Sequence, residues 1–443
     1  MRIAVVAFLA LVFGCSSDED GGKNGTSSEA GGGNGGTSSE AITYHADVAP
    51  IIGRSCVGCH RSGGVGPIVL DSYGQVKTYG ALVRHVTTER IMPPWLADNS
   101  GDCQTYTDAN WLSDEEISTI AAWVDAGMPE GERGSIQSQV VAHDDHLEDA
   151  THVLTLPAEY TPDIIRDDDD YRCFVIDPGL TRDQYLVEYE LITQNPEIVH
   201  HAIVYNPTSL EAAAEAQALD EAEDGLGYTC FGGPIVDATV AAAWAPGRNV
   251  WAYPEGTGVP LKAGMPQIVQ VHYHVDDFPV PDQSQVALKL VDAVEQELLP
   301  WFYANTELAL PPGQARAVAR FEASPTVYHD AAGTPGYAEP MTIIGIAAHM
   351  HKLGLAERVE VARQDGSGTT CLLDVPRWDF DWQYAYFLEN PVRVEPHDLL
   401  RMRCDFDTRT ESEMVYWGDG TDDEMCLALM YSVFDGGKIP APN

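Results

Sequence analysis

Residues Cys56 to His60 read Cys-Val-Gly-Cys-His, which is a C-x-x-C-H motif. Such a motif can carry a haem, because the two thiols form thioethers with its vinyl groups and the adjacent imidazole ligates the iron. A zinc site, or a thiol redox pair that happens to precede a histidine, is the alternative. We predict that Cys56, Cys59 and His60 hold one covalent haem c.

The residues that flank this motif bear on its interpretation. The segment Arg54–Pro67 and the segment Arg90–Trp95, which contains Met-Pro-Pro-Trp, resemble a bacterial cytochrome c-like domain. That resemblance implies that Met92 is the second axial ligand of the iron. Ligation by Met and His raises the reduction potential relative to two nitrogen ligands. The alternatives are His85, which precedes Met92 on the chain, and an open iron position.

Two histidine pairs farther along the chain have the spacing i and i+2. Successive side chains of a β-strand point to opposite faces, so residues i and i+2 share one face. His349 and His351 can therefore chelate one metal from a single strand. The pair His272 and His274 has the same spacing and could do likewise.

Two adjacent histidines and one methionine complete the candidate metal ligands. His200 and His201 point to opposite faces of a regular strand, so they can bind one metal only if the strand is bulged or ends there. Met425 precedes Cys426, and a thioether ligand favours Cu(I), although a methionine is usually a core residue. Histidine pairs with a methionine suit copper better than other common metals.

The composition is strongly acidic. Among 443 residues, 68 are acidic and 25 are basic, which gives a formal net charge of -43. This charge argues against nucleic acid and against anionic membrane surfaces as partners. It favours a cationic substrate or a basic redox partner, but it also fits a surface that is acidic for solubility alone.

The N-terminus predicts export. Residues Ile3–Phe13 form an apolar run that is too short to span a membrane as a mature helix, and Leu11–Cys15 resembles a bacterial lipobox. An ordinary signal peptide with an incidental cysteine is the alternative. We expect residues 1–14 to be removed and Cys15 to be lipidated, with residues 15–40 as a Gly/Ser-rich tether. The protein would then be anchored to the cell envelope only by lipid, and Ser16 favours the outer membrane.

The residue patterns of the remaining chain change along its length, which indicates a multidomain protein. Residues 41–135 look helical, with a capping-box-like start at Ser113–Glu116, and residues 136–150 are a polar linker. From residue 151 short β-rich runs alternate with turns, which is typical of sandwiches or jelly rolls. We therefore predict a small all-α cytochrome c-like domain followed by two all-β antiparallel domains, 151–300 and 301–443.

The histidine segments together carry a second resemblance. Four segments, in this order, resemble the copper type II ascorbate-dependent monooxygenases, the family of peptidylglycine α-hydroxylating and dopamine β-monooxygenases. The resemblance implies two antiparallel jelly-roll domains with one copper each, and C–H hydroxylation with O2. The matching segments are Val199–His201, Gln270–His274, His349–Gly354 and Asp423–Cys426.

Carried over by position, the resemblance assigns roles. His200, His201 and His272 would bind an electron-transfer copper, and the catalytic copper would take His349, His351 and Met425. His274 has no ligand role in that pattern, so we expect it to support a neighbouring ligand or the fold. The resemblance also implies the disulfides Cys173–Cys230 and Cys404–Cys426, which leave Cys103 and Cys371 as a candidate bridge between the haem and second copper domains.

The sequence departs from the peptide-hydroxylating members at three positions. Ala347, Leu427 and Leu429 replace residues that hold a peptide carboxylate there, so we expect a small or apolar organic substrate. Electrons would come from an ascorbate-like donor or a redox protein and enter through the haem, which we expect to feed the copper at His200, His201 and His272. The alternatives are an exported electron-transfer or copper-binding lipoprotein, and a surface-binding lipoprotein whose histidines hold structural zinc.

Overall fold

The computed structural model describes residues 41–62, 66–133, 146–163, 169–244, 250–275, 278–325, 339–420 and 422–440. The predicted signal peptide, Cys15 and the tether lie outside these residues, as does most of the predicted linker. Residues Ile42–Asn443 form one compact unit. Among the described residues, no helix is both long enough and apolar enough to cross a membrane.

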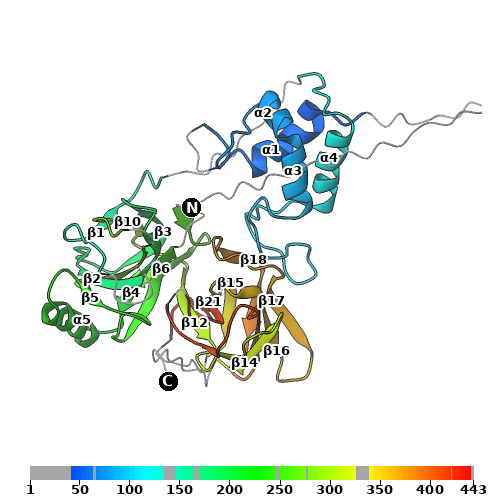
Figure 1. The fold of residues 1–443 in the computed structure, drawn as a ribbon. Helices are drawn as coiled ribbons and strands as arrows, with labels where there is room; N and C mark the ends of the chain where they lie inside the picture. The colour runs from blue at the N-terminus through cyan, green and yellow to red at the C-terminus, as the bar shows by residue number, and fades with distance from the viewer. Residues whose placement is uncertain are drawn as a thin grey trace, which may run out of the picture. The chain divides into compact units, whose positions relative to one another are not determined.

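The N-terminal part of this unit is helical (Figure 1, blue to cyan). Its apolar faces meet around Trp123, which is fully buried with Ile52 and Ile120. The predicted capping box is confirmed, because Ser113 Oγ accepts from the Glu116 amide and the Glu116 carboxylate accepts from the Ser113 amide. The elements are η1 (Tyr44–Val48), α1 (Ala49–Ser55), α2 (Tyr73–Thr78), α3 (Gly80–Thr88) and α4 (Asp114–Asp125).

The first β domain, residues 152–297, consists of two sheets. One has the order β1-β10-β3-β8-β11 with β7 beside β3, and the other has the order β5-β2-β9-β4-β6. Apart from the short parallel pair β8 and β11, neighbouring strands are antiparallel. The strands are β1 (His152–Thr155), β2 (Asp169–Ile176), β3 (Gln184–Ile192), β4 (Val199–Pro207), β5 (Tyr228–Thr229), β6 (Ala238–Trp244), β7 (Val250–Ala252), β8 (Thr257–Leu261), β9 (Gln267–His274), β10 (Gln285–Val291) and β11 (Gln296–Glu297).

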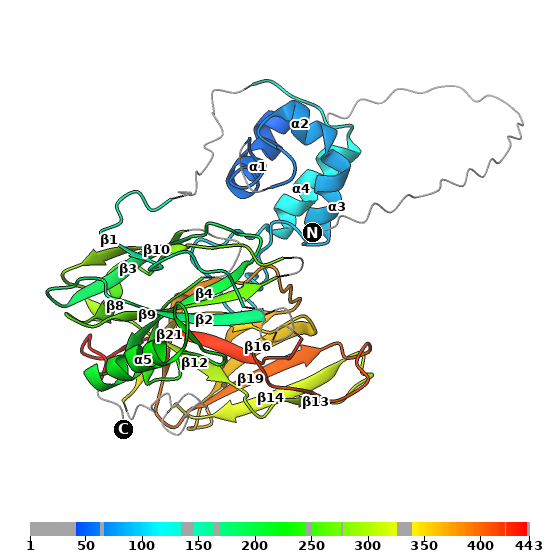
Figure 2. The same cartoon turned by 60° about the vertical axis from the view of Figure 1, so that its left-hand side comes forward.

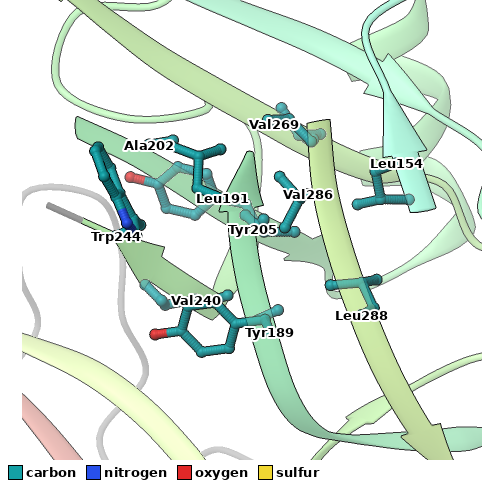
Figure 3. Close-up of a cluster of buried hydrophobic side chains, with 14 of the residues drawn as sticks. Leu154, Tyr189, Leu191, Ala202, Tyr205, Val240, Trp244, Val269, Val286 and Leu288 are labelled. Carbon is teal, nitrogen blue, oxygen red and sulfur yellow. The ribbon is translucent and has the colours of Figure 1, made fainter. Parts of the chain in front are cut away.

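The core of the first β domain lies between these sheets. Figure 3 shows Ala202 and Val269 of the five-stranded sheet together with Leu191, Val286 and Leu288 of the six-stranded sheet. All five side chains are buried. Alternate residues of each strand supply this core, as the period-2 pattern of the sequence predicts. The packed sheets give β2, β4 and β9 a fixed position, and these three strands carry the first group of candidate ligands.

The sequence analysis missed one helix in this domain. Helix α5 (Leu210–Ala222) packs against β2 and β4 and buries Ala212, Ala213 and Ala216 (Figure 2). Its sequence is rich in Ala and Glu, which favour helix, but only small side chains mark its buried face. The apolar pattern that we used to find helices is therefore weak there, and Ser209 is the clearest local signal because its side chain caps the Ala212 amide.

The second β domain, residues 299–434, also has two main sheets, β12-β21-β15-β18 and β14-β19-β16-β17, with a short pair β13-β20. Its buried side chains form a separate core that includes Val359, Leu373 and Phe406. The strands are β12 (Leu299–Ala304), β13 (Ala309–Leu310), β14 (Ala317–Ala323), β15 (Met341–His349), β16 (Gly354–Ala362), β17 (Thr369–Val375), β18 (Ala385–Val394), β19 (Leu399–Phe406), β20 (Val415–Tyr416) and β21 (Leu427–Phe434).

A segment between α3 and α4, residues 95–107, packs into the second β domain. Tyr106 forms a β-bridge with Leu388 on β18, lies in the core of that domain and is 1% exposed. Its hydroxyl donates to the Leu372 carbonyl at 3.1 Å. A disulfide joins Cys103 to Cys371 on β17. The added bridge covers an edge strand, and the disulfide fixes the segment covalently.

Candidate metal centres

The first candidate centre consists of His200 and His201 on β4 and His272 on β9. Their three Nδ1 atoms lie 3.2–3.3 Å apart. An equilateral triangle with this side has its corners about 1.9 Å from its centre, close to the roughly 2.0–2.1 Å of a metal–imidazole bond. Three nitrogen lone pairs at this spacing repel one another unless a cation lies between them. The donor set therefore fits a bound metal ion.

A bulge in β4 makes this arrangement possible. The pairing of β4 with β9 shifts register between Val199 and His201, so the two adjacent histidines do not point to opposite faces as they would on a regular strand. The predicted need for a bulge at His200 and His201 is confirmed. His272 pairs directly with His201 across the two strands, which brings the third ring to the same point.

The buried carboxylate of Asp169 on β2 orients the third ring. His272 Nε2 donates to Asp169 Oδ1 at 3.0 Å, and His274 Nδ1 donates to the same oxygen at 2.6 Å. This bond fixes the His272 tautomer with Nδ1 free to bind a metal. His274 therefore contacts the supporting carboxylate of Asp169 and is not part of the triad. The ring of Tyr171 also stacks on His272, with centroids 4.0 Å apart.

Electrostatics keep the triad neutral. Burial, followed by the neighbouring His272 ring, lowers the pKa of His200 to about 2, and burial lowers the pKa of His201 well below its ordinary value. Burial also lowers the pKa of His272. A metal ligand must be an unprotonated imidazole. These rings therefore do not need to lose protons at neutral pH before they bind a metal.

The second candidate centre consists of His349, His351 and Met425. The two rings are 5.2 Å apart between centroids and nearly perpendicular, and burial lowers the pKa of both, that of His351 to about 3. His349 Nδ1 donates to Gln383 Oε1 at 2.7 Å, and His351 Nδ1 donates to the Asp423 carbonyl at 3.0 Å. Both rings therefore have Nε2 free for a metal, whereas the first triad uses Nδ1.

One expectation about this centre is wrong. Strand β15 ends at His349, so His349 and His351 do not lie on a single strand. The buried carboxylate of Glu424 replaces strand pairing, because it accepts from the amides of His351 and Met425 at 3.0 and 3.2 Å. The His351 carbonyl accepts instead from Trp378 Nε1 at 3.2 Å. Side chains, rather than a continued strand, place His351 beside Met425.

Both centres border one cavity of about 320 Å³ between the two β domains. His201 of the first centre lines this cavity, as do His349, His351 and Met425 of the second centre. Most other lining residues are apolar or aromatic. No lysine or arginine is among the described residues that line it, and Asp419 is the one acid. Examples of the apolar lining are Ile203, Trp244, Trp251, Phe302, Leu427 and Leu429.

The C-x-x-C-H motif lies at the end of α1. Cys56 and Cys59 are the free cysteines among the described residues, and burial raises the pKa of the Cys56 thiol to about 12. A raised pKa disfavours the thiolate that zinc binding or disulfide exchange requires. His60 Nδ1 donates to the Ile68 carbonyl at 3.0 Å, which leaves Nε2 free for an iron. These residues fit a covalent haem.

The two candidates for the second axial ligand differ in exposure. Met92 is half-buried in the segment that follows α3, whereas His85 is exposed on α3. A thioether that binds iron is usually shielded from solvent, so this difference favours Met92. A side chain at Gly66 would meet the His60 ring at 2.5 Å, so the chain there passes directly over the ring.

Three disulfides account for the other cysteines among the described residues. Cys173 is bonded to Cys230 in the first β domain, and Cys404 is bonded to Cys426 in the second, as the resemblance implied. The latter bond joins β19 to the residue that follows Met425. Cys103–Cys371 is the third bond.

Comparison with known families agrees with this geometry. Residues 159–278 match the N-terminal domain of the copper type II ascorbate-dependent monooxygenases, and residues 320–434 match their C-terminal domain. Together the two matches cover more than half of the chain. The chain belongs to this family. The first candidate centre lies within the N-terminal match, and the second lies within the C-terminal match.

Curated relatives are distant but consistent. A putative DBH-like monooxygenase protein 2 of Homo sapiens is 24% identical over 66% of this chain and 59% of its own length. Dopamine beta-hydroxylase of Canis lupus familiaris is 24% identical over 56% of this chain and 40% of its own length. Tyramine beta-hydroxylase of Caenorhabditis briggsae is 29% identical over 43% of this chain and 33% of its own length. The chain thus matches less than two thirds of each relative.

Solved structures give only a remote likeness. The major capsid protein P2 from bacteriophage PM2 aligns with 65% of this chain and 99% of its own, at 12% identity and a TM-score of 0.27.

Three supporting residues were missed by the sequence analysis. Asp169 and Gln383 lie far along the chain from the histidines that they hold, and no local pattern marks them. Glu424 ends the acidic run before Met425 and Cys426. An acid next to these two apolar residues could have been recognised as a candidate for burial. Burial raises its pKa to about 7.

Proposed function

We propose that this protein is a copper-dependent monooxygenase that hydroxylates a C–H bond of a small apolar organic molecule with O2. A covalent haem in the helical part supplies the electrons. The observation that supports this proposal best is that two histidine groups of opposite design border the same apolar cavity. One group is a tight triad, and the other pairs two histidines with a methionine.

The chain would hold one copper at each group. Copper at the first would store an electron, and copper at the second would supply a further electron together with the site of O2 activation. Tyr171 and Asp169 hold the first triad in place. Gln383 and Glu424 hold the second group, and its position beside the cavity gives O2 and substrate access to it.

The lining of the cavity supports the proposed substrate class. Ligand pockets of several hundred Å³ accommodate small molecules, and apolar walls favour apolar ones. Leu427 and Leu429 lie on β21 beside Met425, and Ala347 lies on β15 beside His349. Since the described lining offers no lysine or arginine, an anionic substrate would lose its hydration without a counter-charge. We therefore expect a neutral or cationic apolar substrate.

The electron source and location complete the proposal. His60 would ligate the haem iron with Met92 as the second ligand, and an ascorbate-like reductant or a redox protein would reduce it. Cys15 would carry the lipid that anchors the exported protein to the cell envelope. Cys15→Ser should release the protein from membranes, and unchanged retention in the membrane fraction would contradict the anchor.

Metal analysis of the purified protein tests the main proposal. We expect one iron and two copper ions per chain, a c-type haem spectrum, and two type 2 Cu(II) signals by electron paramagnetic resonance. A screen of neutral and amine-bearing apolar compounds for substrate-dependent O2 consumption follows. Zinc in place of copper, or copper without O2 consumption, would instead support a structural or an electron-transfer role. His60→Ala should remove the haem spectrum and leave copper content unchanged.

A further inference from the structure

A short loop of the second β domain contacts both candidate copper centres. This junction loop, residues 378–384, connects β17 to β18. The Phe380 ring stacks on His200 of the first triad, with centroids 4.8 Å apart and planes 21° apart. The same ring lies 6.2 Å from the ring of His351. Phe380 therefore packs between a ligand of one centre and a ligand of the other.

The next residues of the loop hold the second centre directly. Gln383 accepts from His349 Nδ1 at 2.7 Å, and its own amide donates to the Phe380 carbonyl at 3.0 Å. At the start of the loop, Trp378 Nε1 donates to the His351 carbonyl at 3.2 Å. The loop is thus joined to His349 and His351 by hydrogen bonds and to His200 by ring stacking.

The end of the loop contacts the segment that follows Met92. The Tyr384 ring stacks on Trp95, with centroids 6.4 Å apart and planes 24° apart. Trp95 lies three residues after Met92, and its amide donates to the Pro93 carbonyl at 2.8 Å. Trp95 also meets Tyr386 edge to face at 5.0 Å. The Cys103–Cys371 disulfide and the Tyr106 bridge hold this contact together.

We propose that the junction loop carries electrons from the haem to both copper centres. Electrons pass from the Met92–Trp95 segment to Tyr384 and then along the loop, reaching the first centre through Phe380 and the second through Gln383. This inference rests on the proposed function, since it requires a haem and two coppers. It replaces our earlier expectation that the haem feeds only the first centre, because the segment next to Met92 packs on the second β domain.

The electron count is balanced. Each transfer oxidises one haem iron from Fe(II) to Fe(III) and reduces one copper from Cu(II) to Cu(I). Two transfers prepare both coppers, and an enediol reductant such as ascorbate reduces the haem again after each. The proposed path consists of the Trp95–Tyr384 stack, the short loop from Tyr384 to Phe380, and the contacts of Phe380 and Gln383 with His200 and His349.

The test uses the holoprotein without O2 or substrate. The haem is reduced by a photochemical pulse, and its reoxidation by Cu(II) is followed by visible absorbance. Freeze-quenched samples report the loss of each Cu(II) signal by electron paramagnetic resonance. In Trp95→Leu and Tyr384→Leu we expect reoxidation to slow about tenfold, equivalent to about 1.4 kcal/mol of activation free energy.

Matched variants separate the path from packing. Tyr384→Phe keeps the ring and should transfer electrons at the wild-type rate. Trp111→Leu removes a comparable ring that stacks on Arg90 and is not part of the proposed path, and it should also have no effect. Phe380→Leu should slow reduction of the first copper while reduction of the second stays fast. Haem and copper contents and circular dichroism identify any variant that has not folded.

The outcomes distinguish the two proposals. If wild-type haem is not reoxidised by copper, the proposed haem donor is wrong and the path is wrong with it. If wild-type transfer is fast and both Trp95→Leu and Tyr384→Leu match it while folded, only the junction loop is excluded. Slow transfer in both leucine variants, together with rapid transfer in Tyr384→Phe and Trp111→Leu, supports the loop.

Discussion

The two candidate copper centres use the same side chain in opposite ways. In the first β domain three Nδ1 atoms converge at 3.2–3.3 Å, and a buried carboxylate, Asp169, fixes the third ring. In the second, His349 and His351 use Nδ1 for support and keep Nε2 for metal, and a thioether is the third ligand. The first ligand set is compact, whereas the second lies along the cavity wall.

This difference fits the proposed separation of electron storage from O2 chemistry. A closed triad of neutral imidazoles, stacked upon by Tyr171 and Phe380, can hold copper in a nearly constant environment while its charge changes. A centre with a weaker thioether ligand and an open side can bind a small molecule. Substitutions that change one centre and leave the other intact can test this difference, and the largest effect is expected at Met425.

Met425→Ile should abolish hydroxylation, because it removes a ligand of the open centre and keeps the volume of the side chain. We expect activity to fall by more than the roughly 10–100-fold that loss of a supporting residue causes. The Cu(II) signal of the first centre should persist. Met414→Ile, at an exposed position, is the matched control and should stay active. Normal turnover in Met425→Ile would show that the comparison of the two centres is wrong.

Asp169→Asn should weaken copper binding at the first centre by about 10–100-fold, because a neutral amide oxygen accepts the bonds from His272 and His274 more weakly than a carboxylate does. Binding at the second centre should not change. Titration with a copper chelator, monitored by paramagnetic resonance, measures both sites. His274→Ala keeps the Asp169–His272 bond, so a much smaller loss is expected; an equal loss would mean that His274 is a ligand.

Gln383→Leu should weaken copper binding at the second centre by about tenfold, the lower end of the range for supporting residues, because strand β15 still positions His349. The same chelator titration applies, and the first centre should be unaffected. Gln364→Leu, at an exposed position, is the control. If Gln383→Leu instead weakens the first centre, the loop couples the two sites structurally, and their separation into independent designs is contradicted.

Glu357→Gln should raise the free energy of unfolding by about 1 kcal/mol at neutral pH. Glu357 is 1% exposed in the second β domain and lies beside the His349 backbone, and burial raises its pKa well above 4.5 although a hydrogen bond from that backbone opposes the shift. Asp169, by contrast, is buried with two partners.

The sign of the pH dependence follows from linkage. A folded-state pKa above the unfolded value means that stability is fully present below about 4.5 and is lost as the pH rises toward the folded pKa. The gain from Glu357→Gln should therefore be larger at pH 8 than at pH 5, measured by denaturant unfolding. A gain that does not depend on pH would indicate that Glu357 has the same charge in the folded and unfolded states, and that burial does not raise its pKa.

Much of the site could be predicted from the sequence because its ligands occur in short motifs. The spacing of His349 and His351, the adjacent His200 and His201, and the C-x-x-C-H motif each carry local geometric requirements. The need for a bulge at His200 and His201 followed from strand geometry alone, and the register shift confirms it. The short β-rich runs after residue 151 likewise indicated strands, and β3, β9, β10 and β16 lie among them.

The sequence by itself therefore determined the ligand types, the β-rich class of the larger part and the helical start at Ser113. Only the tertiary structure decided which atoms face the metal, because Asp169, Gln383 and Glu424 set the ring orientations from distant strands and loops. Only folding could bring Phe380 to His200, and Trp95 to Tyr384. These contacts depend on how whole sheets pack, and packing is a property of many residues that no short stretch of sequence encodes.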